Sequence, residues 1–486
     1  MLKHLKGFTV VMVAALTFLS CGGSTTSQTG TTPAGSGQLA LMGTDAPVCG
    51  VASFDVTITS VTLTPQGGGT PVSVMDSSNP VTVDFASLMG FNTLLNMSSV
   101  PAGTYSQVTF TFMPNPSLTV FDGTPPAPTD ISATLTRTTV TANIVPALHV
   151  TANGSSGLTL DFRLFQSIQT DPNTGQITGQ VDPSIRVIPA VITAASGPGI
   201  DKLNGIVETV TTTSSNSSFT GSFTLRVRNR RTFQVNVANN TKFEGVSDLS
   251  GLTQGMFVEV DARVDPDGNI VARHVESEAE TDATTAAFVG PVLSVTRDSN
   301  GNATQLTLFV RAEHPDVSTT VPLRSKLTVN LSSSTGFRIA TFGADLSSFL
   351  FNASAIARGQ HVVVHGPFTG GSTPTVTGNL IVLRPQPALG NALASPSPVV
   401  GSDGKTGGYY LAPCNPLFQN QTVNVVTFYS TFFNGLTDLN SLDNTSVYLN
   451  RGFLLYTTTS GSLNGLSWTA PAYVFPAYVV RKLNLP

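Results

Sequence analysis

Apolar and polar residues alternate in short segments over most of the chain, as they do in strands that bury one face. Residues 54–63 place Phe54, Val56 and Ile58 on one side and polar residues on the other. The same alternation recurs in three later segments, at 81–85, 107–112 and 158–162. Each segment is bounded by glycine, proline or asparagine, and the only helical candidate is residues 85–95. Because strands follow one another without interleaved helices, we predict an antiparallel β-sandwich.

A second pattern begins near residue 203 and repeats. Each unit contains a Thr-x-Phe segment and, further on, a glycine followed by an apolar strand. The corresponding segments are Thr241–Phe243 with Gly255–Val260, Thr335–Phe337 with Gly359–Val364, and Thr431–Phe433 with Gly452–Leu455. A repeat of about 70 to 95 residues without a helix is typical of a small closed β-domain.

These patterns divide the folded part of the chain into four domains and one linker. We predict an all-β protein with a sandwich at 38–192, barrels at 203–280 and 286–386, and a third, degenerate barrel at 408–486. Residues 387–407 are rich in proline, serine and glycine, so we expect a linker there that proteases cut first.

The N-terminal residues are typical of a bacterial lipoprotein signal. Lys3 and Lys6 precede an apolar run of about a dozen residues, which is too short to span a bilayer, and the run ends at a single cysteine, Cys21. We therefore expect residues 1–21 to be a signal peptide that ends at Cys21. We also expect Cys21 to carry acyl chains such as palmitate, which bury about 0.8 kcal/mol per methylene in the membrane.

The residues that follow the cysteine predict the location of the protein. Residues 22–37 lack apolar periodicity and form a flexible tether of roughly 20 to 25 Å. Gly22, in place of the aspartate that marks inner-membrane retention, predicts a lipid anchor in the outer membrane. No later apolar run is long enough to cross a membrane.

Composition excludes several partners. Without Lys3 and Lys6 the chain keeps 22 basic residues against 28 acidic ones, a net charge near −6, and we expect no nucleic-acid partner. Arg226–Arg231 is the only basic cluster, and we interpret it as charge that guards an exposed strand edge.

Two cysteines remain once Cys21 is lipidated. Cys49 and Cys414 are separated by most of the chain, in a compartment where disulfides persist. They are either two free, buried thiols or an inter-domain disulfide, because sequence alone does not place two Cα atoms within bonding range.

Five landmarks between residues 38 and 190 resemble the family called domain of unknown function 4382. They are Thr44–Pro47, Phe54–Leu63, Pro101–Tyr105, Leu160–Phe162 with Ser167-Ile168, and Asp182–Arg186. The resemblance implies a β-sandwich in a bacterial lipoprotein or secreted protein, and it implies no activity.

The repeated units resemble the family called domain of unknown function 5666, which implies barrels similar to the OB-fold. The first unit, with its Asp267-Gly268 turn, matches well. The second unit carries inserted loops, and the third has lost the Asp-Gly turn.

Histidine and carboxylate pairs do not predict a metal site. His361 and His365 flank three valines in a strand, so they lie about 13 Å apart and cannot share one ion. His274, Glu276 and Glu278 alternate on one strand face, which we interpret as solvated.

Other acidic residues occur in turns. Asp298–Asn302 and Asp265–Gly268 resemble calcium loops but lack the closing glutamate, so we interpret both as hairpin turns. Asp45 and Asp161 could meet across the sandwich, and we favour structural hydrogen bonding there, with calcium as the alternative.

The chain lacks the usual catalytic constellations. No Gly-x-Ser-x-Gly elbow occurs, and Gly401–Thr406 lacks the first glycine of a phosphate loop. We predict no catalytic or cofactor-binding residues and no cofactor. Trp468, Tyr448, Tyr456 and Tyr473 could form an aromatic shelf for a sugar, although we favour packing in a core or interface.

Together these observations predict a non-catalytic envelope lipoprotein that acts as a scaffold, adhesin or binding module. Its expected partners are the membrane, through the lipid anchor, and envelope proteins or polysaccharide. A carbohydrate- or cell-wall-binding lipoprotein is the first alternative, and an envelope hydrolase with an unrecognised carboxylate pair is the second.

Overall fold

The computed structural model describes residues 35–483, except 46–47, 194–196, 215, 217, 229–230, 281–284, 315–318, 342–345 and 419–420. The predicted signal peptide, Cys21 and nearly all of the tether lie outside the described residues. In the described part, no helix is both long and apolar enough to cross a bilayer.

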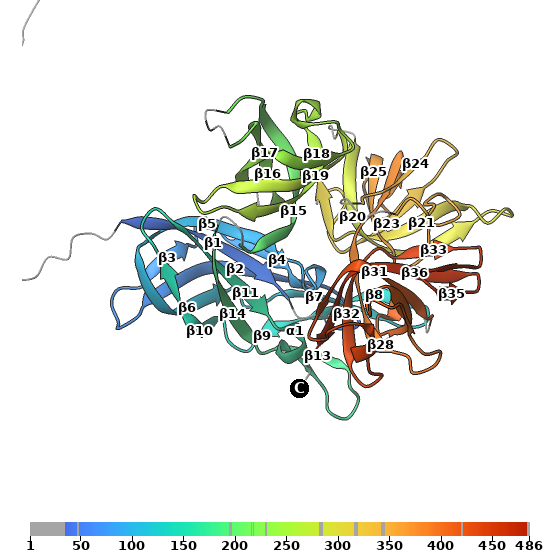
Figure 1. Cartoon of the computed structure of the whole chain (residues 1–486), viewed down its shortest axis with the longest axis horizontal. Coiled ribbons are helices and arrows are strands. Elements are labelled where there is room, and N and C mark those ends of the chain that lie inside the picture. Colours follow the sequence, from blue (N-terminus) through green and yellow to red (C-terminus); the bar gives the residue numbers. More distant parts are fainter. Residues whose placement is uncertain are drawn as a thin grey trace, which may run out of the picture. The chain divides into compact units, whose positions relative to one another are not determined.

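The N-terminal domain is a sandwich of two main sheets (Figure 1). One sheet has the strand order β14 (Ile185–Val191), β11 (Ser155–Phe162), β1 (Ser36–Thr44) and β5 (Thr93–Pro101). The other has the order β10 (Thr139–Val150), β6 (Gly103–Phe112), β2 (Val51–Pro65), β7 (Ser117–Asp122) and β8 (Ala127–Ser132), with β3 (Val72–Met75) and β4 (Val81–Asp84) also paired to β2. Most pairs are antiparallel as predicted, but β1 and β11 are parallel.

The core of the sandwich follows the predicted alternation. Phe54, Val56 and Ile58 of β2 are fully buried, together with Phe110 and Phe162. The predicted helix at 85–95 is wrong. A single 3-10 turn at Phe85–Ser87 is followed by β5, because the buried Leu94 and Leu95 point to opposite sides of a strand and join different cores.

Short elements complete the sandwich. A third sheet contains β9 (Thr134–Leu135), β13 (Ile177–Val181) and β12 (Ile168–Thr170). The helix α1 spans only Leu164–Ser167.

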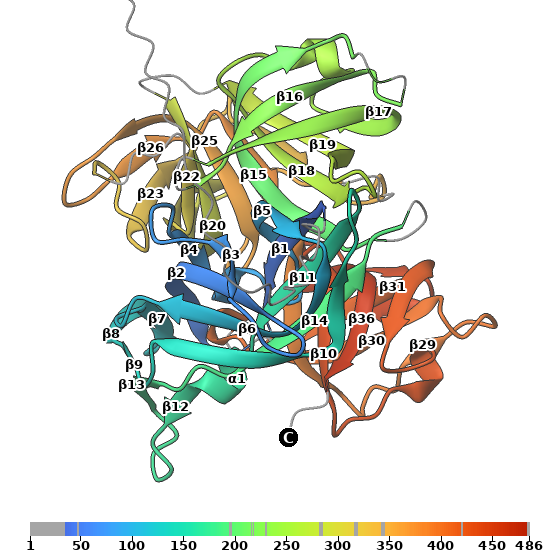
Figure 2. The ribbon, with the colours of Figure 1, turned by 90° about the vertical axis from the view of Figure 1, so that its left-hand side faces the viewer.

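The second domain is a closed barrel of five strands (Figure 2). Its strands are β15 (Gly199–Thr211), β16 (Gly221–Arg226), β17 (Thr232–Glu244), β18 (Met256–Val264) and β19 (Ile270–Glu280). They close in the order β15-β16-β17-β19-β18, with β17 and β19 parallel. This is the all-β barrel, similar to the OB-fold, that the repeat predicts.

The third domain closes through the same sequence of pairings. Its path runs from β20 (Thr285–Arg297) through β21 (Ala303–Phe309), β23 (Lys326–Asn330), β26 (Thr375–Thr377) and β25 (His361–Thr369), and returns to β20. The parallel pair β23–β26 is continued by β24 (Gly336–Ile339) and β27 (Leu380–Leu383), while β22 (Ala312–His314) pairs with β20.

The fourth domain repeats this closure and begins earlier than predicted. Its path is β28 (Gln386–Ala392), β30 (Gly407–Pro413), β31 (Val423–Asn434), β36 (Ala472–Leu483) and β32 (Val447–Gly452), which returns to β28. Residues 387–407 are therefore not a free linker. Their first part is the opening strand of the barrel, and β29 (Val399–Val400) pairs with β30.

Three further short strands belong to this last domain. β33 (Leu455–Thr457) pairs with β36. β34 (Gly461–Leu463) and β35 (Leu466–Trp468) form a hairpin between β32 and β36.

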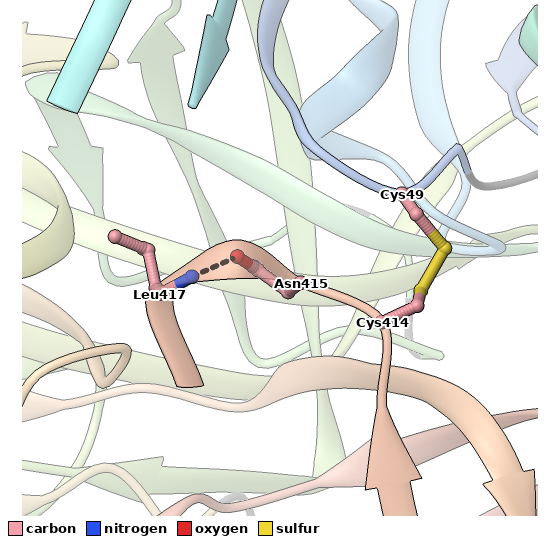
Figure 3. The surroundings of a disulfide bond; sticks show 4 residues. All are labelled: Cys49, Cys414, Asn415 and Leu417. Atoms are coloured by element: carbon pink, nitrogen blue, oxygen red, sulfur yellow. Dashed lines mark hydrogen bonds between the residues drawn. A yellow bond between two sulfur atoms is a disulfide. The ribbon is translucent and has the colours of Figure 1, made fainter. Parts of the chain in front are cut away.

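Cys49 of the sandwich and Cys414 of the last barrel form a disulfide, with Cα atoms 5.5 Å apart and a sequence separation of 365 (Figure 3). Beyond Cys414, the backbone N–H of Leu417 donates to the side-chain oxygen of Asn415 at 3.0 Å. Of the two alternatives that the sequence leaves open, the structure therefore has the disulfide.

Candidate functional site

Three glutamates form a row across the outside of the first barrel. Glu276 on β19 is paired in register with Glu244 on β17 and with Glu259 on β18. Alternation along the strands directs the intervening apolar residues, such as Val258 and Val275, into the barrel core. The glutamates therefore point away from that core and toward the second barrel.

Side chains of the second barrel cover this row. Arg338 on β24 approaches Glu276, with Nη2 2.8 Å from Oε1. Arg384, just beyond β27, forms an ion pair with Glu259. The backbone N–H of Thr341 donates to Oε2 of Glu244 at 3.0 Å, and the Thr341 hydroxyl donates to the other carboxylate oxygen.

His274 completes the cluster. It lies two residues before Glu276 on β19, and its Nε2 is 3.4 Å from Oε1 of Glu244. One ligand atom each from Glu244, His274 and Glu276 can be chosen so that all lie within 4.8 Å of one another. We refer to these three residues as the Glu-His-Glu cluster.

Burial of this cluster overturns one prediction. Glu276 has no exposed surface and His274 is only 5% exposed, so the face interpreted as solvated is covered by the second barrel. The side chain of Glu278 is outside the described part of the structure. The sequence analysis did not single out Glu244, because it precedes His274 by 30 residues. The parallel pairing of β17 with β19, the third and fifth strands of the barrel, brings the two residues together.

Burial also changes the acidity of the cluster. It raises the pKa of Glu276 to about 9, with further upward contributions from the neighbouring Glu244, while Arg338 acts in the opposite direction. Burial lowers the pKa of Arg384 to about 9. The row thus places three carboxyl groups beside two guanidinium groups and the imidazole of His274.

Apolar contacts surround the charged row. Phe257 and Ile206 of the first barrel pack with Val289, Val363 and Val382 of the second. His314 stacks on Phe257 with ring centroids 4.5 Å apart.

Arg228 and Arg231 join the first barrel to the sandwich, and Arg226 pairs within the barrel, so these arginines do not guard an exposed edge. Arg226 pairs with Glu208 at 2.8 Å, and Arg228 pairs with the buried Asp55 of the sandwich at 3.1 Å. Arg231 donates to the backbone oxygen of Leu95, also in the sandwich. The interpretation as edge protection is therefore wrong for these residues.

A cavity of about 150 Å³ lies where the sandwich and the first two barrels meet, and its lining includes Arg228, Arg311, Arg384 and Asp84. Burial and the nearby Asp55 raise the pKa of Asp84, while Arg311 opposes that shift. Charges of both signs meet here in direct contacts between domains, which indicates a structural junction.

The last barrel carries an open, polar cleft of about 620 Å³ beside Trp468. Tyr410 and Trp468 line it, and the hydroxyl of Tyr410 donates to the backbone oxygen of Ser467 at 3.0 Å. The indole N–H of Trp468 donates to the Thr459 oxygen at 3.2 Å, which fixes the ring. Polar groups from Gln421 and other residues line the remainder.

The other aromatic residues of the sequence prediction lie elsewhere. Tyr448 is fully buried and contacts Tyr409 in the barrel core. Tyr456 and Tyr473 pack on each other, and the hydroxyl of Tyr473 donates to the Arg358 oxygen of the second barrel at 3.0 Å. Trp468 and its neighbour Tyr410, which the sequence did not single out, therefore define the aromatic cleft.

The remaining candidate residues have structural contacts. Asp45 accepts a hydrogen bond from the Leu164 N–H at 3.1 Å, and Asp161 lies 3.4 Å from Arg186. Asp265 and Asp298 accept backbone N–H groups within their own turns. His361 and His365 lie opposite different residues of β20, namely Pro291 and Ala287.

Comparisons with known families agree with the two resemblances. Residues 36–178 match the model of the Domain of unknown function (DUF4382), and residues 204–276 match that of the Domain of unknown function (DUF5666). The chain thus carries these two domains in the predicted order.

Comparisons with individual proteins add little. No curated protein matches the chain. A solved structure described as "drosophila Unr CSD456" is 10% identical, with 59% of this chain and 98% of that chain covered, and its TM-score of 0.14 supports no argument.

Proposed function

We propose that this protein is a non-catalytic lipoprotein of the bacterial cell envelope, anchored in the outer membrane through acylated Cys21. Its folded part serves as a rigid scaffold or adhesion module that carries binding surfaces away from the membrane. The observation that carries the proposal is the covalent and ionic linkage of all four domains.

Ion pairs link the domains in addition to the disulfide. Asp55 of the sandwich lies 3.1 Å from Arg228 of the first barrel and 3.1 Å from Arg324 of the second. Asp201 of the first barrel lies 3.3 Å from Arg451 of the last. Such linkage suits a protein that transmits or resists force between an anchor and a partner.

The disulfide also supports the proposed compartment. Disulfides persist in the periplasm and at the cell surface and are rare in the cytosol. A bond between Cys49 and Cys414 therefore agrees with export directed by residues 1–21.

Replacement of Cys21 tests the anchor. In cells supplied with labelled palmitate, the wild-type protein should incorporate label and fractionate with outer membranes, and Cys21→Ser should lose both properties. Cys49→Ala is the matched control and should keep the label. Equal labelling of Cys21→Ser and wild type would contradict the proposal.

A carbohydrate-binding function is the second candidate, and the cleft beside Trp468 favours it. A fixed indole ring beside hydroxyl and amide groups can stack on a sugar ring while the polar groups bind its hydroxyls. Trp468→Ala should abolish retention on immobilised envelope polysaccharide. Phe432→Ala, at a side chain that is 62% exposed and not part of this cleft, should retain binding. Retention that is unchanged in Trp468→Ala would exclude this cleft.

A further inference from the structure

The Glu-His-Glu cluster has the donor atoms of a transition-metal site. It offers one imidazole nitrogen and two carboxylates, a combination that suits Zn²⁺ and related first-row ions. Adjacent strands of a closed barrel supply all three side chains, so the backbone holds them in place without a loop.

The distances agree with a shared ion. Ligands about 2.0 to 2.2 Å from a tetrahedral Zn²⁺ lie about 3.3 to 3.6 Å from one another. The separation of His274 Nε2 and Glu244 Oε1 is 3.4 Å, and the whole set lies within 4.8 Å. The three side chains would supply three of the four positions of a tetrahedral ion.

Charge balance points the same way. In the described part of the structure, Arg338 pairs with Glu276 and Arg384 pairs with Glu259, and Glu276 has no exposed surface. A cation shared by Glu244 and Glu276 would further offset the cost of burying their charge. Glu244 is the most exposed member, with 24% of its side chain accessible, and it provides an entry path.

We propose that Glu244, His274 and Glu276 bind a divalent first-row metal ion, of which Zn²⁺ is the representative. The ion would join β17 to β19. Glu244 also binds Thr341, and Glu276 also contacts Arg338, so the ion would fix the second barrel against the first. This proposal does not depend on the lipid anchor or on polysaccharide binding.

The test uses the full mature protein in detergent, stripped with a chelator and then titrated with Zn²⁺. We expect one Zn²⁺ per chain by elemental analysis and an increase in melting temperature that saturates with Zn²⁺. A wild-type protein that retains no Zn²⁺ after gel filtration would overturn the proposal.

Two variants and one control locate the ion. His274→Ala and Glu276→Gln should each lose the bound Zn²⁺ and the Zn²⁺-dependent shift in melting temperature. His149→Ala removes an exposed histidine of the sandwich and should bind as the wild type does. Glu276→Gln keeps the size of the side chain without its charge, so its melting temperature in chelator shows that it is folded. A full Zn²⁺ shift in this variant would overturn the assignment.

Discussion

At the scale of single residues, burial decides the chemistry of Glu276. The same side chain on a free strand would be an ordinary exposed acid. Between two barrels it has no exposed surface, and its pKa rises from 4.5 to about 9. The groups that face it come from several elements. They are Glu244 on β17, Glu259 on β18, His274 on β19, Arg338 on β24 and Arg384 beyond β27.

This shift predicts a pH dependence of stability in chelator-treated protein. Folded Glu276 keeps its proton up to about pH 9, whereas the unfolded chain loses it near pH 4.5. The folded state therefore binds more protons between these values, and stability decreases as the pH rises through that range. Urea unfolding of wild type and Glu276→Gln from pH 5 to pH 9 should show a shallower decrease in the variant. Parallel curves would contradict the raised pKa.

At the scale of elements, the alternation of apolar and polar residues predicted well where strands form. It predicted poorly where the last domain begins. Segments such as 54–63 and 107–112 became strands because their apolar residues bury on one face. The sequence prediction was wrong where the local composition favours a loop but distant segments pair with it as strands. Residues 386–392 contain two glycine or proline positions and alternate weakly, yet β30 and β32 supply their hydrogen-bond partners.

Gly390 marks residues 386–392 as a strand, but the sequence analysis did not use it. Gly205, Gly290 and Gly390 hold equivalent places in the first strand of each barrel. A Cβ atom there would lie 2.3, 1.8 and 2.0 Å, respectively, from a backbone oxygen of the neighbouring strand region. The strand bends close to its neighbour as the barrel closes, and only glycine fits.

Substitution of Gly390 should open the last barrel. Gly390→Ala places a methyl group against the Ala412 oxygen and should destabilise the barrel by about 1–3 kcal/mol, the range for overpacking. Limited proteolysis should then cut residues 386–407, which we expect to be protected in the wild type by their strand pairing. Gly103→Ala, where the nearest atom is 4.0 Å away, is the control and should be cut as slowly as the wild type. Equal protection of Gly390→Ala would show that the strand tolerates the change.

At the scale of the whole molecule, the arrangement of the four domains was beyond the sequence. The Asp55 ion pairs, and the pairs of Arg338 and Arg384 with the glutamate row, join residues from different domains, with no signal in any one repeat. The all-β class and the barrels similar to the OB-fold were predictable, because alternating strands bury apolar residues in large core clusters.

The disulfide should contribute strongly to stability. Loss of a crosslink that closes a 365-residue loop increases the entropy of the unfolded chain, and we expect Cys49→Ala/Cys414→Ala to lower the free energy of unfolding by about 2–5 kcal/mol. Urea unfolding of oxidised wild type, reduced wild type and the double variant measures this. The reduced wild type should match the double variant, and an unchanged midpoint in both would argue against a stabilising bond.

The same disulfide can form only after the chain has been made as far as Cys414. Cys49 precedes its partner by 365 residues, so in a chain exported N-terminus first, as proposed above, it would arrive long before Cys414 and have no correct partner until Cys414 followed. Thiol oxidation in that interval can only produce mixed species that must be exchanged. A chain truncated before Cys414 would therefore retain a reactive thiol, by which an envelope oxidoreductase could distinguish incomplete molecules from finished ones.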